Sequence, residues 1–172
     1  YYSWNNSATT AAITISPSAN TTYTVTVTNA ANCTATASGS VTVNSTPTAL
    51  VTPSTQSICN GQNATLTASG GTSYLWSTTA TTAAITVSPT STTTYTVTVT
   101  NASNCSATAS GSVTVNALPT AQVTPSSQSI CNGQNATLTA SGGTSYVWNT
   151  SASTAAITVN PTTTTTYTVT VT

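Results

Sequence analysis

The sequence repeats itself at an interval of 72 residues, and this repetition limits the fold more than any other feature. Residues 47–100 match residues 119–172 at 46 of 54 positions. Self-similarity at a fixed interval is the mark of an array of one structural unit. Two sets of aromatic residues recur at the same interval, Trp4, Trp76 and Trp148, and Tyr23, Tyr95 and Tyr167.

Proline residues mark the expected domain boundaries. Pro47 and Pro119 each follow a Val-Thr-Val-Asn run after a very short linker, and short proline-containing linkers are stiff. We therefore expect the C-terminal part of a first repeat in residues 1–46, a complete repeat in residues 47–118 and the N-terminal part of a third in residues 119–172. The chain is then a window cut from a longer array.

Within one repeat the apolar residues alternate with Thr and Ser, which is the period of a β-strand and not of a helix. Turn sequences such as Ser-Gly-Gly-Thr separate the alternating runs. Six or seven short strands in about 70 residues predict an all-β fold made of β-sandwich domains. The strands expected in the complete repeat are residues 49–52, 64–68, 74–76, 85–87, 95–100 and 106–115.

The expected core is modest because the alternating apolar residues are mostly small. A domain of this size buries only about 60% of the surface that its unfolded chain exposes, so it needs support from neighbours or disulfides. The recurring Trp and Tyr residues named above are all expected in the core. In the complete repeat the large core candidates are Leu66, Tyr74, Trp76, Ile85, Val87, Tyr95, Val97, Val99, Val113 and Val115.

The chain carries no Asp, Glu, Lys, Arg or His among its 172 residues. A soluble domain is ordinarily about 25% charged, so this absence removes whole classes of function. General acid–base catalysis needs a His, a carboxylate or a Lys, and a hydroxyl nucleophile needs a neighbouring base. Metal sites rest on carboxylates, His or clustered Cys. We therefore expect no enzyme, no catalytic residue, no metal site and no cofactor.

The same composition argues against two kinds of partner. Nucleic-acid binding depends largely on Lys and Arg, which are absent. Apolar runs reach only two or three residues, far fewer than a membrane-spanning helix needs, and no signal peptide is visible. We expect neither a nucleic-acid partner nor a membrane span.

Two stretches of the complete repeat resemble a known family. They are ICNGQNATLTASGGTSYLW at residues 58–76 and AAITVSPTSTTTYTVTVTNASNCSATASGSVTVN at residues 83–116. They resemble the Ig-like and PKD-like tandem repeats of very large secreted surface proteins of Bacteroidota-type bacteria, and the likeness covers essentially the whole chain. It implies tandem Ig-like β-sandwich domains with Trp76 on the expected strand at residues 74–76 and Tyr95 at the start of the expected strand at residues 95–100.

Proteins with such repeats are usually adhesins, stalks or other extracellular scaffolds, and their repeats rarely do chemistry. The resemblance therefore implies a structural extracellular filament or stalk, secreted or on the cell surface. The alternative is a cell-surface adhesin that recognises glycans or surfaces. The turn at residues 101–104 departs from the family because Asn replaces any carboxylate there, which argues against calcium binding.

The four cysteines form two sets, with Cys59 and Cys131 before an expected strand and Cys33 and Cys105 at an expected turn. Regular spacing in a secreted protein suggests disulfides. In an Ig-like sandwich these turns lie at opposite ends, more than ~20 Å apart, whereas a disulfide needs Cα atoms within ~7 Å. The resemblance thus favours disulfides between adjacent domains, with partners outside this chain or in neighbouring subunits. A Cys59–Cys105 pair and free thiols are the alternatives.

The outward faces of the expected strands are rows of Thr and Ser, which are good strand formers on a half-buried surface. Natural sheets usually protect exposed edges with charge, and this chain has none. A charge-free surface also lacks the repulsion that keeps copies apart. The expected partners are therefore copies of this chain in a polymer or lateral bundle, with glycans as a second candidate.

The free energy of unfolding is expected to be nearly constant between about pH 4 and pH 8. Tyr and Cys ionise near pH ~10 and ~8.5, so no side chain changes its proton count in this window. Urea unfolding at a series of pH values measures this directly. A steep acid-induced loss of stability above pH 4 would contradict the prediction.

Overall fold

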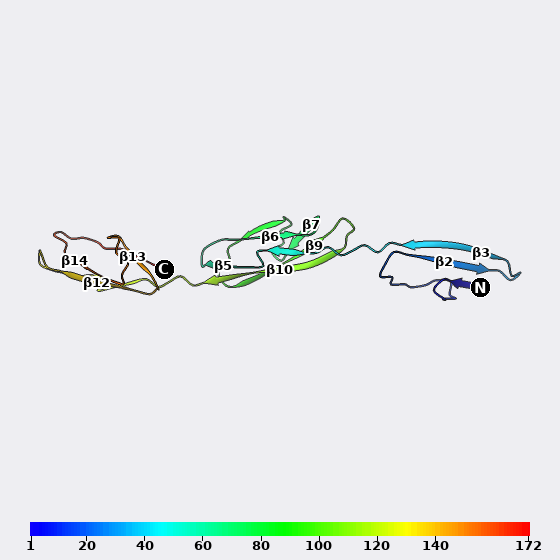
Figure 1. The fold of residues 1–172 in the computed structure, drawn as a ribbon, viewed down its shortest axis with the longest axis horizontal. Coiled ribbons are helices and arrows are strands. Elements are labelled where there is room, and N and C mark those ends of the chain that lie inside the picture. Colours follow the sequence, from blue (N-terminus) through cyan, green and yellow to red (C-terminus); the bar gives the residue numbers. More distant parts are fainter. The chain divides into compact units, whose positions relative to one another are not determined.

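The computed structural model, which describes all of residues 1–172, consists of fifteen β-strands and contains no helix (Figure 1). The strands form several small sheets with antiparallel pairing. The expectation of an all-β chain is therefore confirmed. Its cause is local, because Thr and Val are β-branched and alternate along the runs that become strands.

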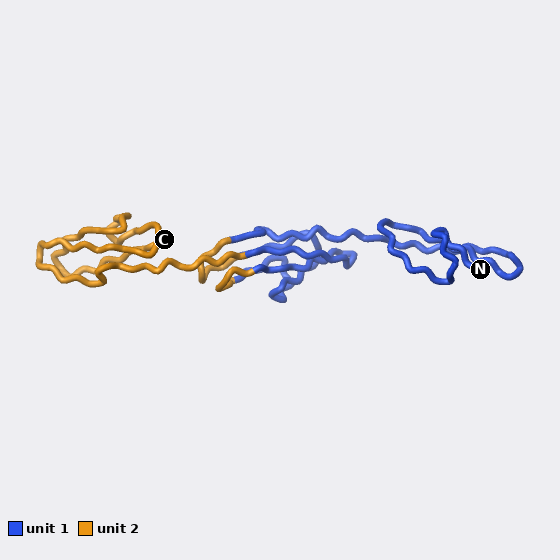
Figure 2. The backbone as a smooth tube through the Cα atoms, turned by 90° about the horizontal axis from the view of Figure 1, so that it is seen from below, with its two compact units in different colours: residues 1–56, 65–87, 94–112 blue, residues 57–64, 88–93, 113–172 orange.

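The chain divides into two compact units, which Figure 2 shows in different colours. One unit holds residues 1–56, 65–87 and 94–112, and the other holds residues 57–64, 88–93 and 113–172. Residues 47–118 contribute to both units. The strands are described below in chain order.

Residues 1–46 form one antiparallel sheet in the order β1 (Tyr2–Trp4), β2 (Thr21–Thr28), β3 (Thr34–Val41). The last two strands are a hairpin in which Thr28 is opposite Thr34. All eight residues of β3 are exposed. This strand therefore has one hydrogen-bonded neighbour and buries neither of its faces.

Residues 47–118 contain seven strands in two sheets, one in the order β4-β6-β8 and the other in the order β5-β10-β9-β7. Gly111 of β10 faces the first sheet, because an added Cβ would lie 2.7 Å from Val51 Cγ1 and 3.4 Å from Leu66 Cδ2. Only a glycine, which has no Cβ, allows β10 to approach these two side chains so closely. The strands are β4 (Leu50–Thr52), β5 (Thr55–Cys59), β6 (Ala64–Ser69), β7 (Ser73–Trp76), β8 (Ala84–Val87), β9 (Thr93–Thr100) and β10 (Ser106–Asn116).

Residues 119–172 contain five strands, in a three-stranded sheet of order β11-β12-β14 and a two-stranded sheet of β13 and β15. Ala140, Trp148 and Ile157 form its buried cluster, and partly buried apolar side chains pack around them. The strands are β11 (Gln122–Thr124), β12 (Ala136–Ser141), β13 (Tyr146–Trp148), β14 (Ala156–Val159) and β15 (Val169–Val171).

The six strands expected in residues 47–118 are all present, with ends that differ by one or two residues. Sequence analysis missed β5 (Thr55–Cys59). Ile58 is its one large aliphatic residue, and Pro53 and Ser54 precede it, so the segment reads as a turn rather than a strand. Its pairing with β10 comes from a partner nearly 60 positions away in the sequence and has no local signal.

The core of residues 47–118 is apolar, and no polar side chain is buried. Leu66, Val97, Val99 and Val113 are completely inaccessible to solvent. Of the other expected core residues, Trp76, Ile85 and Tyr95 are buried, whereas Tyr74, Val87 and Val115 are half-buried. Two buried residues were not expected, Val51 and Ile58.

Replacing Gly70 by Ala is expected to destabilise residues 47–118 by about 3 kcal/mol. Gly70 has φ of +103°, and a Cβ at this position would overlap the Thr48 carbonyl. The matched control is Gly61→Ala, because Gly61 has φ of +86° but nothing within 4 Å of an added Cβ. The Gly61→Ala change should lower the free energy of unfolding by about 1 kcal/mol, because it strains the backbone conformation but causes no overlap. Urea unfolding followed by tryptophan fluorescence tests the pair, and equal losses would contradict the prediction.

Candidate functional site

The joint between residues 1–46 and residues 47–118 is the candidate functional site of a chain whose expected role is mechanical. Residues 42–49 contain no strand and include Pro47. The turn between β9 and β10 contacts two carbonyls of this linker. Asn101 Nδ2 donates to the Ser45 carbonyl at 2.8 Å, and Cys105 Sγ donates to the Asn44 carbonyl at 3.8 Å.

Asn101 orders its own turn as well as the linker. Its Oδ1 accepts from the backbone N–H groups of Ser103 and Cys105, both at 3.0 Å. The Asn101 N–H donates to the Cys105 carbonyl at 3.0 Å and closes the turn. An amide provides both an acceptor oxygen and a donor NH₂. An Asp carboxylate in place of Asn101 would still accept the two turn bonds. It has no donor for the Ser45 carbonyl, so an oxygen would face that carbonyl oxygen and repel it.

The same turn occurs between β2 and β3. Asn29 Oδ1 accepts from the N–H groups of Ala31 and Cys33, both at 2.9 Å. The following Asn32 and Asn104 both have positive φ, 63° and 60°, a conformation that Asn tolerates better than most residues. The turn is thus a property of the local Asn-x-x-Asn-Cys sequence, while the bond to the linker is an additional feature of Asn101.

The other end of β10 is held by the turn after β5. The Asn60 N–H donates to the Asn116 carbonyl at 2.9 Å, and the Gln62 N–H donates to the Cys59 carbonyl at 3.0 Å. Asn116 and Asn44 occupy the same position in the 72-residue repeat. The carbonyl at this position is therefore contacted by two kinds of turn: Asn60 of the same segment contacts Asn116, and Cys105 of the following segment contacts Asn44.

All four cysteines are free thiols. Cys105 is half-buried, whereas Cys33, Cys59 and Cys131 are exposed. Cys59 lies beside the C-terminal end of β10, because Asn60, the next residue, is bonded to Asn116, the last residue of this strand. Cys105 lies at the other end, directly before the first residue of β10. A strand of 11 residues spans roughly 30 Å or more, so this arrangement gives no support to a Cys59–Cys105 disulfide.

The recurring aromatic residues adopt one local structure in all three segments. Each Trp indole N–H donates to the carbonyl of the Thr six residues later, at 2.9 to 3.0 Å. Trp76, Trp148 and Tyr95 are buried. Trp4, Tyr23 and Tyr167 are half-buried.

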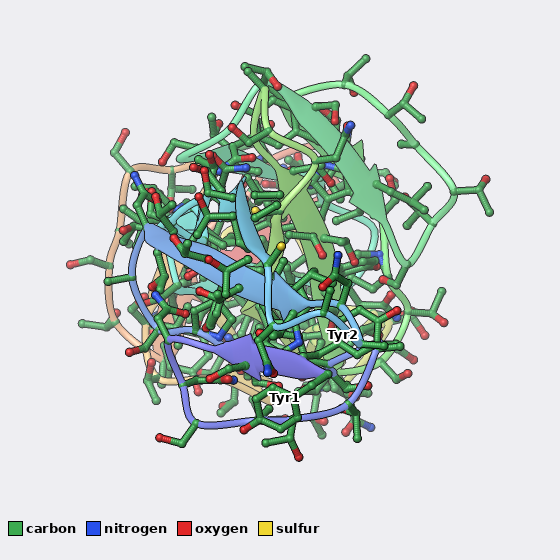
Figure 3. The ribbon with its side chains drawn as sticks, turned by 90° about the vertical axis from the view of Figure 1, so that its right-hand side faces the viewer. Tyr1 and Tyr2 are labelled. Carbon is green, nitrogen blue, oxygen red and sulfur yellow. The ribbon has the colours of Figure 1, made fainter.

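Two aromatic residues are exposed, Tyr1 at 71% and Tyr2 at 38%. Figure 3 labels both at the end of the chain that faces the viewer. The Tyr1 nitrogen donates to the Thr28 carbonyl at 2.9 Å, which holds this residue at the end of β2. The other aromatic side chains are buried or half-buried.

No group of three or more His, Cys, Asp or Glu side chains lies together in the structure. None of its elements is a helix with the length and apolarity needed to cross a membrane. No protein-family model matches the chain, and no curated protein matches it. The chemistry available is that of hydrogen-bonding amides and hydroxyls, four thiols and apolar cores.

Sequence analysis identified the cysteines and the turn at residues 101–104 but missed the role of Asn101 at the joint. The hydrogen bond from Asn101 to Ser45 joins residues 56 positions apart, so no local sequence pattern indicates it. The recurring Asn-x-x-Asn-Cys sequence beside a short linker was the available signal.

Replacing Asn101 by Asp is expected to loosen the linker, because it removes the donor to the Ser45 carbonyl and adds a negative charge there. The expected cost is about 1–2 kcal/mol of local stability. The matched control is Asn29→Asp, since Asn29 makes the same two turn bonds and no bond to a linker. NMR relaxation of the Ser45 and Thr46 amides measures the effect, and unchanged mobility in the Asn101 variant would refute the role of this bond.

Proposed function

We propose that this chain is part of a structural extracellular filament or stalk, built from tandem Ig-like β-sandwich domains and without catalytic activity. The observation that carries the proposal is the tie between the turn after β9 and the linker, through Asn101 and Ser45. A joint fixed by a short proline-containing linker and a hydrogen-bonded turn resists bending. Such joints suit a chain that transmits force or holds a spacing.

The arrangement of residues 47–118 supports the Ig-like part of the proposal. Seven strands in two sheets match the strand number of the constant-type Ig sandwich. Gly111 of β10 packs against β4 and β6 of the other sheet. Trp76 is buried on β7, and Tyr95 is buried near the start of β9, which are the places where an Ig-like domain carries a Trp and a Tyr.

The contacts of the linker also support disulfides between adjacent domains. Cys105 Sγ lies 3.8 Å from the Asn44 carbonyl. At the equivalent carbonyl of Asn116 the neighbouring group is Asn60, which directly follows Cys59. In a continuous array each joint would bring one cysteine of each type to the same residue. A disulfide there would add about 2–4 kcal/mol of stability.

The placement of aromatic side chains favours the filament over the adhesin. Protein surfaces that bind partners tightly are enriched in exposed Trp and Tyr. Here the three Trp are buried or half-buried, and Tyr1 and Tyr2 are the exposed aromatics. The uncharged surface further supports association between copies that is insensitive to salt.

Electron microscopy of native, untagged material tests the proposed function. We expect uniform filaments or extended strings whose axial interval is one or two repeats. Compact particles without such an interval would contradict a structural role. A glycan-array signal that disappears when Tyr1 and Tyr2 are both replaced by Ala would favour the adhesin instead.

A further inference from the structure

Two turns of the chain share the sequence Cys-Asn-Gly-Gln, at residues 59–62 and 131–134. In each turn the Gln N–H donates to the Cys carbonyl at 3.0 Å, so the Asn and the Gly occupy the two central positions. Both glycines have positive φ, +86° for Gly61 and +81° for Gly133, and an added Cβ on either would meet nothing within 4 Å. All residues of the two turns are exposed. The Asn-Gly pair in each turn is therefore open to solvent.

An Asn-Gly pair can react with itself, because the nitrogen of the Gly can close a ring onto the carbonyl carbon of the Asn side chain. The attacking nitrogen must lose its proton, and it must come close to the Asn Cγ. A hydrogen bond from that N–H to an acceptor opposes the first step, and a Cβ on the attacking residue crowds the second. Glycine has no Cβ, so the hydrogen bonding of its N–H decides how reactive the pair is.

The turn that contains Gly61 leaves the nitrogen of this residue without a hydrogen bond. The turn uses the N–H groups on either side, because the Asn60 N–H donates to the Asn116 carbonyl at 2.9 Å and the Gln62 N–H closes the turn. The Gly61 N–H has no acceptor in the structure, and neither has that of Gly133. Each Gly nitrogen can therefore attack the preceding Asn side chain once a base from the solvent removes its proton.

The other Asn residues lack this combination of features. Only Asn60 and Asn132 precede a glycine. Asn104 is also exposed, but the nitrogen that follows it, on Cys105, donates to Asn101 Oδ1 at 3.0 Å. That hydrogen bond holds the proton that the reaction has to remove.

Asn63 provides a comparison within the same exposed loop. Its Oδ1 accepts from Ser88 Oγ at 2.6 Å, and the next residue, Ala64, is 1% exposed and begins β6. Asn135 is held in a similar way, because its Oδ1 accepts from Asn160 Nδ2 at 2.9 Å. In both cases the side-chain amide is fixed by a partner and the attacking residue carries a Cβ.

We propose that Asn60 and Asn132 are sites of self-modification, at which the following glycine converts the side-chain amide to a carboxylate. The Gly nitrogen forms a bond to the Asn Cγ, the bond between Cγ and Nδ2 breaks, and ammonia leaves with the proton that the Gly nitrogen has lost. Water then opens the cyclic succinimide at either of its carbonyls. Opening at Cγ gives Asp, and opening at the main-chain carbonyl gives isoaspartate, in which the backbone runs through the side-chain carbon atoms.

The products change a turn that contacts the end of β10. Isoaspartate at position 60 lengthens the backbone between Cys59 and Gln62 by one carbon atom, so the hydrogen bond that closes this turn loses its geometry. Either product also places a negative charge on a chain that has no other charged side chain. This inference deepens the proposed function and rests on it for its biological role. In a stalk, the turn that contacts the Asn116 carbonyl would loosen with age.

Peptide mass spectrometry of the reduced chain, sampled during storage in mildly alkaline buffer, tests the modification. The chain has no Lys or Arg for trypsin, so chymotrypsin is the protease, and a sample taken before storage corrects for conversion during digestion. We expect Asp and isoaspartate to accumulate at Asn60 and Asn132, whereas the amides of Asn63 and Asn135 are retained. Equal conversion at all four residues overturns the proposal.

A synthetic peptide of residues 58–64 sets the reference rate. The folded chain should convert Asn60 within about tenfold of the peptide rate, because an open turn adds less than ~1.4 kcal/mol to the barrier. A slower conversion in the folded chain also overturns the proposal, since the turn would then protect the pair.

The matched variant replaces both residues, Asn60→Gln with Asn132→Gln. Gln keeps the amide but must close a larger ring, so it reacts far more slowly. Anion-exchange chromatography at mildly acidic pH, where thiols are protonated, should show acidic species that grow in the unaltered chain and are missing from this variant. The control Asn104→Gln should acquire them at the unaltered rate. Acidic species that persist in the double variant assign the reaction to other residues and overturn the proposal.

Hydrogen exchange of the Gln62 amide tests the consequence for the turn. In the isoaspartate form, separated by chromatography, this amide should exchange faster than in fresh chain. The Asn104 amide closes a different turn by donating to the Asn101 carbonyl at 3.0 Å, and its exchange should not change. Unchanged exchange at Gln62 overturns the loosening, while the mass spectra decide the modification. Neither result depends on electron microscopy, which decides the stalk.

Discussion

The pairing and packing of strand β10 (Ser106–Asn116) control how much of each segment is buried. β10 lies between β5 and β9, and its Gly111 faces β4 and β6. Where this strand is present, Leu66, Val97 and Val99 are inaccessible to solvent. In residues 119–172, which contain no counterpart of β10, the corresponding Leu138, Val169 and Val171 are half-buried. In a chain without ion pairs, burial of apolar surface and backbone pairing provide the stability.

The absence of charged side chains makes the stability of the sheets depend more strongly on strand pairing and apolar burial. Most sheet proteins protect a free edge with Lys, a bulge or a covering element. Here β3 is exposed along its length and carries Thr, Ala and Ser, so no side-chain charge protects it. The same composition that led us to expect no acid–base catalysis also leaves this strand without a protecting charge.

Much of the fold could be predicted from the sequence because its signals are local. Alternation of Val and Thr predicted β9, and the Ser-Gly-Gly-Thr turns predicted the limits of β6 and β7. β5 and the burial of Val51 were missed because both depend on a partner far away in the chain. The bond from Asn101 to Ser45 was missed for the same reason, because it joins residues 56 positions apart.

The Asn44 and Asn116 carbonyls, which occupy the same position of the 72-residue repeat, explain how consecutive repeats could be joined. Asn44 meets Cys105 of the following segment, and Asn116 meets the Asn60 turn of its own segment. In an array of the proposed kind, one such carbonyl at each joint would receive both contacts. Every joint would then contain the same residues, and the array would bend and stretch uniformly along its length.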